Sequence, residues 1–379
     1  MVLSFTFIPF SIIIKEKGGI SMNAFFPELT KNFGFGCMRF PMNGEAVDIP
    51  AVKDMVDIFM EAGFTYFDTA RPYHGGKSEL ILKEVLTSRY PRESYFLTNK
   101  LSPNCFEKEE DIRPFFQSQL DACGVEYFDF YLFHANSATR HQKFTETRAY
   151  DIVQELKAEG KIRHVGMSFH DTAEALDMIL TARPEIEVVQ LQFNYVDYED
   201  PNVQSRACYE VCKKHGKPVL VMEPVKGGSL VNLPQKAMEL LSDTPASYAI
   251  RFAASFENVV MVLSGMSNME QVLDNIRYMK DFQPLNEEEM ALIGKVRTLY
   301  QAQNRIPCTA CRYCTDGCPA GIDIPGLFAC LNAKREGKEA DYDAFEVKAD
   351  ACVECGQCEG ECPQHLQIRD LLKEVAAAF

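Results

Sequence analysis

Two cysteine-rich stretches decide the fold of the C-terminal end of this chain: CTACRYCTDGCP, residues 308–319, and CVECGQCEGECP, residues 352–363. Each follows the pattern C-x2-C-x2-C-x3-C-P, and together they hold eight of the fourteen cysteines. Four thiolates on one short, turning stretch of backbone can surround a cubic iron–sulfur cluster. The eight candidate metal ligands are Cys308, Cys311, Cys314, Cys318, Cys352, Cys355, Cys358 and Cys362.

The spacing resembles the runs by which bacterial ferredoxins hold [4Fe–4S] clusters, where the fourth cysteine of each run ligates the other cluster. The resemblance implies two clusters in a small ferredoxin-like domain. One cluster would use Cys308, Cys311, Cys314 and Cys362, and the other would use Cys352, Cys355, Cys358 and Cys318. Zinc is the alternative metal, because paired C-x2-C knuckles also bind it. Zinc ribbons, however, usually separate their knuckles by about a dozen or more residues.

Clusters need reduced thiols and low oxygen, so we expect a cytoplasmic protein of an anaerobic or microaerobic cell.

Composition and charge argue against several classes of partner. The net charge of −15 argues against nucleic acid, whose phosphates are bound by clustered Lys and Arg, and it also disfavours anionic membrane surfaces. The body of the chain has no apolar stretch near the roughly 20 residues of a membrane span.

The first 21 residues form an N-terminal extension. Residues 1–14 are apolar, but a signal peptide places positive charge before its apolar stretch, and here Lys15 and Lys17 follow it. Residues 15–19, KEKGG, imply a purine-rich message of the kind that precedes a bacterial start codon. We interpret residues 1–21 as either untranslated, with Met22 as the true start, or disordered.

Between residues 32 and 281 short β-branched or aromatic runs alternate with longer helical patterns. The expected strands cover residues 34–40, 64–68, 95–100, 128–134, 162–168, 188–192, 218–222 and 259–263. The expected helices include residues 52–62, 77–88, 113–123, 149–159, 202–215, 246–255 and 269–279. The strands lack a polar alternating face, as in a parallel sheet covered by helices. Seven or eight such units predict an α/β fold of the (β/α)8 TIM-barrel type. A doubly wound open sheet is the alternative, although no G-x-G-x-x-G follows the first strand.

These patterns divide the chain into a barrel at residues 22–284, a linker helix at 285–306 and a cluster domain at 307–379. Asn286 is the expected N-cap of the linker helix, with Glu289 three residues later as in a capping box. Two further helices are expected at residues 324–334 and 368–378.

Four polar residues follow the ends of the barrel strands, where this fold builds its active sites. They are Asp68, Tyr73, Lys100 and His134. An ammonium beside a phenol favours the phenolate and lowers its pKa, and a carboxylate would hold the ammonium in place. The set therefore predicts a proton donor for a developing alkoxide, as carbonyl reduction by hydride requires.

Residues 34–281 resemble the aldo/keto reductase superfamily. The motifs are FDTARPY (67–73) with GKSE (76–79), GKIRHVGMS (160–168) and VVQLQFNY (188–195). With the cluster domain, the chain from residue 22 onward resembles the ferredoxin-fused branch of that superfamily. The resemblance implies Tyr73 as general acid, Lys100 and Asp68 as the pair that lowers its pKa, and His134 as the residue that orients the substrate.

The resemblance also implies an NAD(P)H site. Its residues would be Ser168 and Gln190 at the carboxamide, Met222 where many members stack an aromatic ring, Lys226 and Gly227 along the pyrophosphate, and Gly265, Ser267, Gln271 and Asn275 around the adenosine. Residues 264–271, SGMSNMEQ, lack the basic side chain that often binds a 2′-phosphate. NADH and NADPH therefore both remain open.

Three functions stay open at this stage, because a hydride carries two electrons and a cluster takes one. In the first, the barrel reduces a small carbonyl or oxidises an alcohol while the clusters exchange electrons with a ferredoxin-like partner. In the second, the barrel works alone and the clusters are structural or redox-sensing. In the third, the barrel is a nucleotide-sensing regulatory module. No flavin fingerprint is present. The expected substrate walls are loops 101–110, 135–146 and 195–201, with the aromatic candidates Phe106, Phe144, Tyr195 and Tyr198.

Overall fold

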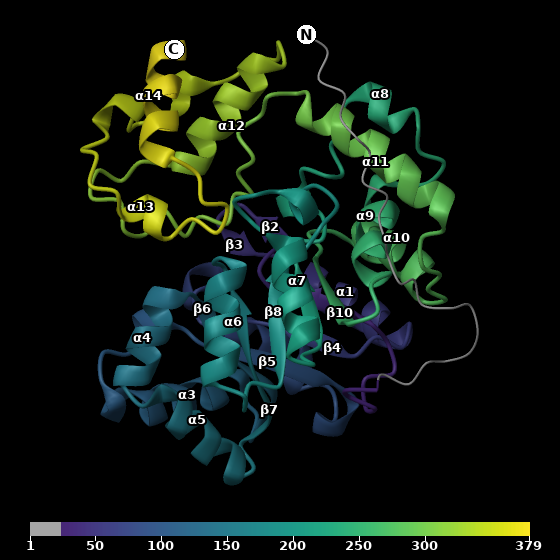
Figure 1. The fold of residues 1–379 in the computed structure, drawn as a ribbon, viewed down its shortest axis with the longest axis vertical. Helices are drawn as coiled ribbons and strands as arrows, with labels where there is room; N and C mark the ends of the chain where they lie inside the picture. Colours follow the sequence, from purple (N-terminus) through teal and green to yellow (C-terminus); the bar gives the residue numbers. More distant parts are fainter. Residues whose placement is uncertain (1–23) are drawn as a thin grey trace.

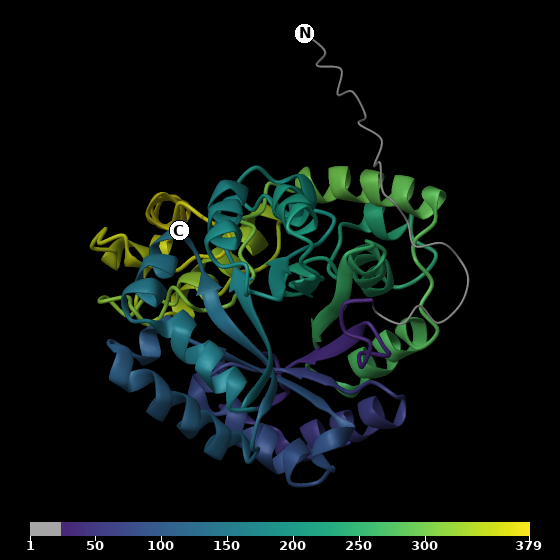
Figure 2. The same ribbon diagram turned by 60° about the horizontal axis from the view of Figure 1, so that its bottom comes forward.

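The computed structural model describes residues 24–379. The interpretations of residues 1–21 and of the start at Met22 lie outside the described residues. Within them, eight parallel strands close into a barrel surrounded by helices (Figures 1 and 2). Around the barrel the strands are β1 (Phe33–Gly36), β10 (Val259–Gly265), β9 (Val219–Met222), β8 (Val188–Gln192), β7 (Ile162–Phe169), β6 (Phe128–Asn136), β5 (Phe96–Leu101) and β4 (Tyr66–Asp68).

The register between β1 and its two neighbours closes the sheet. Gly34 lies opposite Leu263 of β10 on one side and opposite Tyr66 of β4 on the other. An added Cβ at Gly34 would approach the Leu263 side chain to 2.8 Å, so the absence of a side chain allows the strands to meet there. The expected (β/α)8 barrel is confirmed, and the open-sheet alternative is excluded.

Helices cover the outside of the barrel. In chain order they are α1 (Ile49–Glu61), α2 (Ser78–Leu82), α3 (Glu109–Cys123), α4 (Ala138–Glu146), α5 (Ala149–Ala158), α6 (Ala173–Ala182), α7 (Ser205–Lys214), α8 (Gln235–Met238), α9 (Pro245–Ala254) and α10 (Met269–Met279). Residues 77–88, expected as one helix, divide into α2 and a π-helical turn at Lys83–Thr87. Part of the expected loop 135–146 forms α4, because the Ser137 hydroxyl caps it by accepting from the Arg140 amide.

Two apolar layers hold the barrel. One lies between the strands and the helices and contains side chains such as Phe59, Val153 and Phe252. The other fills the barrel interior, where Phe26 and Leu29 pack against strand residues such as Phe130. The Phe26 and Phe130 rings meet edge to face at 5.1 Å. The segment before β1 thus plugs one end of the barrel and leaves the other end for chemistry.

Helix α11 (Glu287–Gln301) joins the barrel to the C-terminal domain. The expected capping box is confirmed, since the Glu289 amide donates to Asn286 and the Asn286 amide donates to the Glu289 carboxylate, both at 2.9 Å. The C-terminal domain contains α12 (Ile324–Arg335), α13 (Gln357–Gly360) and α14 (Ile368–Ala378) around its own apolar core. Figure 1 shows it as a yellow lobe above the barrel.

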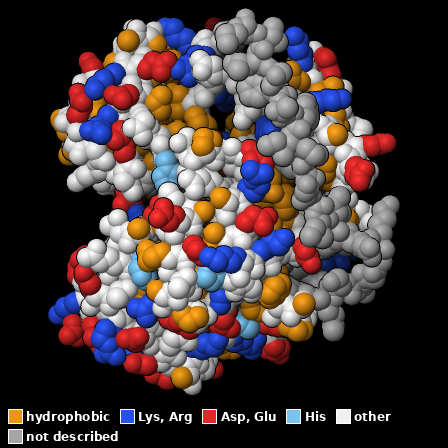
Figure 3. All heavy atoms as spheres, in the orientation of Figure 1, with side chains coloured by type: hydrophobic (Ala, Val, Ile, Leu, Met, Phe, Trp, Pro, Cys, Tyr) orange, Lys and Arg blue, Asp and Glu red, His pale blue; other side chains and the backbone are white. Residues whose placement is uncertain are grey.

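The surface carries charges of both signs. Figure 3 shows Asp and Glu side chains interspersed with Lys and Arg side chains over the barrel helices of the visible face. Among residues 24–379, no helix combines the length and the apolar character needed to cross a bilayer.

Candidate active site and cluster cavities

The four strand-end residues converge at the open end of the barrel. The Lys100 ammonium lies 2.6 Å from Asp68 Oδ1, 2.8 Å from the Thr69 carbonyl oxygen and 3.3 Å from the Tyr73 hydroxyl. The His134 ring meets the Tyr73 ring edge to face, with 6.3 Å between centroids. Strands β4, β5 and β6 supply three of the residues, and Tyr73 begins the turn after β4.

A second set of contacts orients these side chains. The Gln190 amide of β8 donates to Asp68 Oδ2 at 3.0 Å, so both carboxylate oxygens have partners. Nδ1 of His134 shares a hydrogen bond of 2.7 Å with the Ser102 hydroxyl, which leaves Nε2 as the nitrogen available to a ligand. Gln190 and Ser102 thus help to hold Asp68 and His134 in their observed orientations.

The protonation states differ in one respect from the sequence-based expectation. Burial and the Asp68 charge raise the pKa of Tyr73 well above its usual value, whereas the expectation was a lowered pKa. Burial is the main cause, because it disfavours the charged phenolate, and the Lys100 ammonium on which the expectation relied is paired with Asp68 at 2.6 Å. Burial and Lys100 hold the pKa of His134 well below its usual value. At neutral pH the site therefore offers a protonated phenol and a neutral imidazole.

The C-terminal domain also contributes to this site. Tyr313, between Cys311 and Cys314, lies beside Tyr73, and the two phenols influence each other's pKa. Its ring meets the His134 ring edge to face at 6.3 Å between centroids. Sequence reasoning missed Tyr313, because its position in the cysteine run gives no sign of which way it faces.

A long cleft begins at Asp68 and Tyr73 and extends across β9 and β10 to α10. Its volume is about 1030 Å³. Of the residues expected to hold the nucleotide, those that line the cleft are Gln190, Met222, Gly227, Gly265, Ser267, Gln271 and Asn275. Arg39 and Arg277 also line it and were missed. Arg277 is paired with Asp243 and Asp274, at 2.6 and 2.8 Å.

Two of the residues expected at the nucleotide, Ser168 and Lys226, do not belong to the described lining of the cleft. The Ser168 hydroxyl instead accepts from the Ala135 amide at 2.7 Å. It thereby braces the left-handed turn that follows His134, where Ala135 has a φ of 52°.

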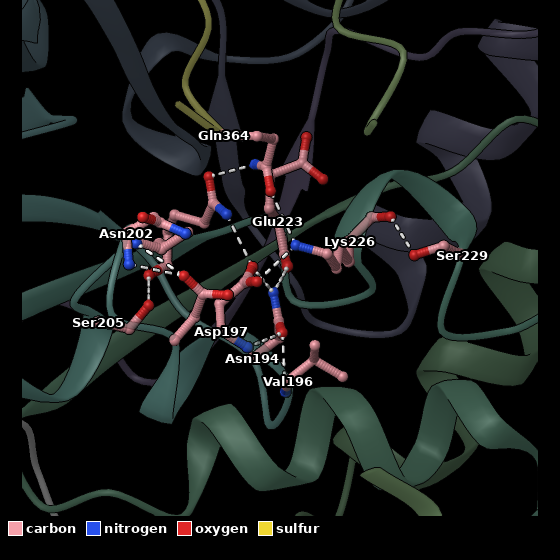
Figure 4. A network of polar contacts seen from close by, with 12 residues as sticks. Asn194, Val196, Asp197, Asn202, Ser205, Glu223, Lys226, Ser229 and Gln364 are labelled. Atoms are coloured by element: carbon pink, nitrogen blue, oxygen red, sulfur yellow. Dashed lines mark hydrogen bonds and ion pairs between the residues drawn. The ribbon is translucent and has the colours of Figure 1, made fainter. Parts of the chain in front are cut away.

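Lys226 turns away from the cleft into a buried polar network, shown in Figure 4. Its ammonium lies 2.5 Å from Asp197 and 2.7 Å from the side-chain oxygen of Gln364, a residue of the C-terminal domain. Gln364 in turn donates to Gln192 at 2.7 Å. Lys226 has a left-handed backbone conformation, with a φ of 49°, and its ammonium lies in this network.

The eight motif cysteines surround two cavities in the C-terminal domain. Cys308, Cys311, Cys314 and Cys362 line the first, and Cys318, Cys352, Cys355 and Cys358 line the second. This is the grouping that the ferredoxin-like spacing implied. Within residues 24–379, no three His, Cys, Asp or Glu side chains converge on one point that could hold a single metal ion. The thiols are instead spread around apolar cavities, an arrangement that suits a polynuclear cluster.

The first cavity lies on the barrel side of the domain. Its lining residue Thr309 accepts from Arg39 at 2.8 Å and packs directly against Gly227 of the cleft. Glu361, next to Cys362, forms an ion pair of 2.7 Å with Arg140 of α4. The candidate nucleotide cleft and the first cavity are therefore in contact through the backbone of residues 308–309.

The aromatic residues proposed for the substrate walls are buried in packing. Phe106 and Phe144 stack on each other at 6.0 Å, and Tyr195 and Tyr198 pack against Phe252. None of the four is among the described residues that line the cleft. Tyr313 is the aromatic side chain that the structure adds beside Tyr73 and His134.

Comparison with known proteins agrees with this geometry. The sequence model of the Aldo/keto reductase family matches residues 32–298. This chain belongs to the aldo/keto reductase family. A second model, the 4Fe-4S dicluster domain, matches residues 307–366, which contain both cysteine stretches. The pair of matches identifies the chain as an aldo/keto reductase fused to a ferredoxin-type domain.

Relatives and solved structures cover the aldo/keto reductase barrel. The 9,11-endoperoxide prostaglandin H2 reductase of Trypanosoma cruzi is 24% identical over 270 residues, which cover 68% of this chain and 88% of the relative. The NADH-specific methylglyoxal reductase of Escherichia coli is 27% identical over 196 residues, 46% of this chain and 57% of the relative. The structure of an aldo-keto reductase from Klebsiella pneumoniae in complex with NADPH has a TM-score of 0.57 at 20% identity, covering 71% of this chain and 90% of that one.

Proposed function

We propose that this chain reduces small carbonyl compounds with NAD(P)H, with Tyr73 as the proton donor. The observation that carries the proposal is the position of Lys100, whose ammonium contacts Asp68 at 2.6 Å and the Tyr73 hydroxyl at 3.3 Å at the end of the cleft. Relatives named as NADH-specific and structures with NADPH support a nicotinamide cofactor without deciding between the two.

The residues suit each part of that reaction. A reduced nicotinamide in the cleft would supply the hydride to the carbonyl carbon. Gln190, Met222 and Gly227 would hold the nucleotide. Tyr73, which is protonated at neutral pH, gives its proton to the carbonyl oxygen as the hydride reduces the C=O double bond to an alcohol. The neutral His134 orients that oxygen, and Lys100 donates to the phenolate that remains.

We further propose that the two cavities hold [4Fe–4S] clusters on the eight motif cysteines and that the protein works in a cytoplasm poor in oxygen. The contacts of Thr309 with Gly227 and of Tyr313 with Tyr73 favour electron exchange between barrel and clusters over purely structural clusters. A ferredoxin-like partner would then give electrons to the clusters or take them.

The test uses anaerobically purified protein with its iron intact. NADH or NADPH is added with and without a panel of aldehydes, and both nucleotide absorbance and the broad iron–sulfur absorption are followed. We expect carbonyl-dependent nucleotide oxidation that falls by about 10²- to 10⁴-fold in Tyr73→Phe, with nucleotide binding retained. Turnover that survives this substitution would remove Tyr73 from its role. Bleaching of the clusters by nucleotide supports electron exchange, and unchanged clusters support the structural or sensory alternative.

A further inference from the structure

Tyr313 is a residue of the C-terminal domain that lies beside two candidate catalytic residues of the barrel, Tyr73 and His134. Its neighbours Cys311 and Cys314 line the first cluster cavity, whereas Tyr313 contacts Tyr73 and His134. The backbone on its N-terminal side is unusual, because Ala310 and Arg312 both have left-handed conformations, with φ of 53° and 67°. Non-glycine residues rarely adopt that region, so the loop is held in this shape by its surroundings.

We propose that Tyr313 is a positioning residue of the reductase site, which stabilises the Tyr73 oxygen and closes the substrate side of the pocket. The active site is then composite: the barrel supplies the acid, and the cluster domain supplies the residue that supports it. This inference rests on the proposed carbonyl reduction by Tyr73.

The hydroxyl of Tyr313 acts on the charge that proton transfer leaves behind. When Tyr73 gives up its proton, its oxygen becomes negative and needs hydrogen-bond donors. Lys100 is one donor, but its 3.3 Å contact with Tyr73 is longer than its contacts with Asp68 and Thr69, at 2.6 and 2.8 Å. Tyr313 supplies the second donor, because its phenol lies beside Tyr73 and its ring packs edge-on against His134 at 6.3 Å between centroids.

The ring of Tyr313 limits the space beside the acid. The rings of Tyr73 and Tyr313 each stand edge-on to His134, at 6.3 Å and with interplanar angles of 82°. Two contacts fix the domain around this ring: Arg39 donates to the Thr309 carbonyl at 2.8 Å, and Arg140 pairs with Glu361 at 2.7 Å. These contacts hold the backbone on both sides of the first cavity against the barrel, and we infer that the ring stays beside the acid and favours small, unbranched carbonyls over bulky ones.

The experiment compares three variants of the full-length protein, purified without oxygen and with its iron retained. Tyr313→Phe removes the hydroxyl and keeps the ring, Tyr313→Ala removes both, and Tyr342→Phe is the matched control. Tyr342 belongs to the same domain, and its hydroxyl lies away from the active site, where it accepts from the Ala349 amide at 3.2 Å. Each variant is assayed for iron content, for nucleotide affinity by fluorescence, and for kcat and KM with propanal and with 4-tert-butylbenzaldehyde.

We expect Tyr313→Phe to lower kcat by roughly 10- to 100-fold, the equivalent of one hydrogen bond to a charged group, with nucleotide affinity and KM nearly unchanged. Tyr313→Ala should lose a similar factor on propanal, and its preference for propanal over the bulky aldehyde should shrink by about tenfold relative to Tyr313→Phe. Tyr342→Phe should match the wild type.

Two results would overturn the inference. One is a Tyr313→Phe enzyme within about threefold of the wild-type kcat, and the other is an equal loss in the Tyr342→Phe control. Because Tyr313→Phe preserves the packing, it carries the test even if Tyr313→Ala loses its clusters. If Tyr73→Phe abolishes the activity and Tyr313→Phe leaves it intact, the inference about Tyr313 is refuted and the proposed function stands. Turnover that persists in Tyr73→Phe refutes the proposed function and the inference together.

Discussion

Replacing Gly227 with alanine should loosen the contact between the candidate nucleotide cleft and the cluster domain. A Cβ at this position would lie 2.4 Å from the Thr309 carbonyl oxygen and 2.7 Å from the Thr309 Cα. Because these are backbone atoms, no side-chain rotation relieves the clash. Thr309 would have to retreat by about 1 Å to reach an ordinary contact of 3.4 Å.

The size of the effect follows from two terms. Gly227 has a φ of 62°, and alanine in the left-handed region costs about 1–2 kcal/mol. The retreat of Thr309 also breaks its hydrogen bond from Arg39, now 2.8 Å, which adds about 1–3 kcal/mol because the donor is charged. Gly216 is the matched control: its φ is 63°, and nothing lies within 4 Å of an added Cβ. Gly216→Ala should therefore show the backbone term alone.

Amide hydrogen exchange can measure the loss of stability in the segment around Thr309. In Gly227→Ala, peptides that cover residues 305–315 should exchange roughly 5- to 150-fold faster than in the wild type, which corresponds to about 1–3 kcal/mol of local opening. The same peptides should be unchanged in Gly216→Ala. If both variants left these peptides protected, or if both exposed them equally, the clash with Thr309 would not be the cause and the reasoning would be wrong.

Three further outcomes test other parts of the structure. Lys226→Met should lower the free energy of unfolding by about 3–5 kcal/mol in urea denaturation, since it leaves the buried Asp197 carboxylate without its cation; addition of Asp197→Asn, which removes the charge and can still accept from Gln192 and Asn194, should recover part of that loss. Burial raises the pKa of the Glu187 carboxyl, but hydrogen bonds from His164, Lys157 and the Val165 amide lower it further, from 4.5 to about 2. The stability that Glu187 contributes is therefore complete above pH 4.5 and is lost as the pH falls toward 2. Glu187→Gln should flatten acid unfolding in that window, and an unchanged profile would contradict the assignment. Cys362→Ala and Cys318→Ala should each lose about half of the bound iron, but only the former should lower reductase turnover, because its cavity faces the barrel; equal losses of turnover would contradict this arrangement.

Much of the barrel could be predicted from the sequence, because its strands are short apolar runs bounded by polar residues. The residues that end those runs, Asp68, Lys100 and His134, fall together for the same reason: parallel strands bring their carboxyl ends to one edge. Helix α6 could have been anticipated from the Thr172 cap and its apolar spacing, but the shape of the 135–146 loop depended on a local cap at Ser137.

The parts that escaped prediction depend on how distant segments meet. The family resemblance placed Lys226 along the pyrophosphate, yet the direction of its side chain depends on Asp197 and on Gln364, which is 138 residues away. The raised pKa of Tyr73 follows from burial, which a pattern of residue types does not encode. Tyr313 reaches the active site only because the two domains dock, and no spacing in the sequence reports that contact.

The first cysteine cavity is tied to the barrel through residues that flank its own ligands. Thr309 follows Cys308, Tyr313 precedes Cys314, and Glu361 precedes Cys362. A cluster in that cavity would cross-link the segments around Cys308, Cys314 and Cys362. Its assembly would therefore fix the positions of Thr309, Tyr313 and Glu361 against the barrel. Its destruction by air would free these residues before the barrel itself unfolded. Iron supply would then determine when a newly made chain becomes competent, and exposure to oxygen would switch off a reaction in which oxygen takes no part.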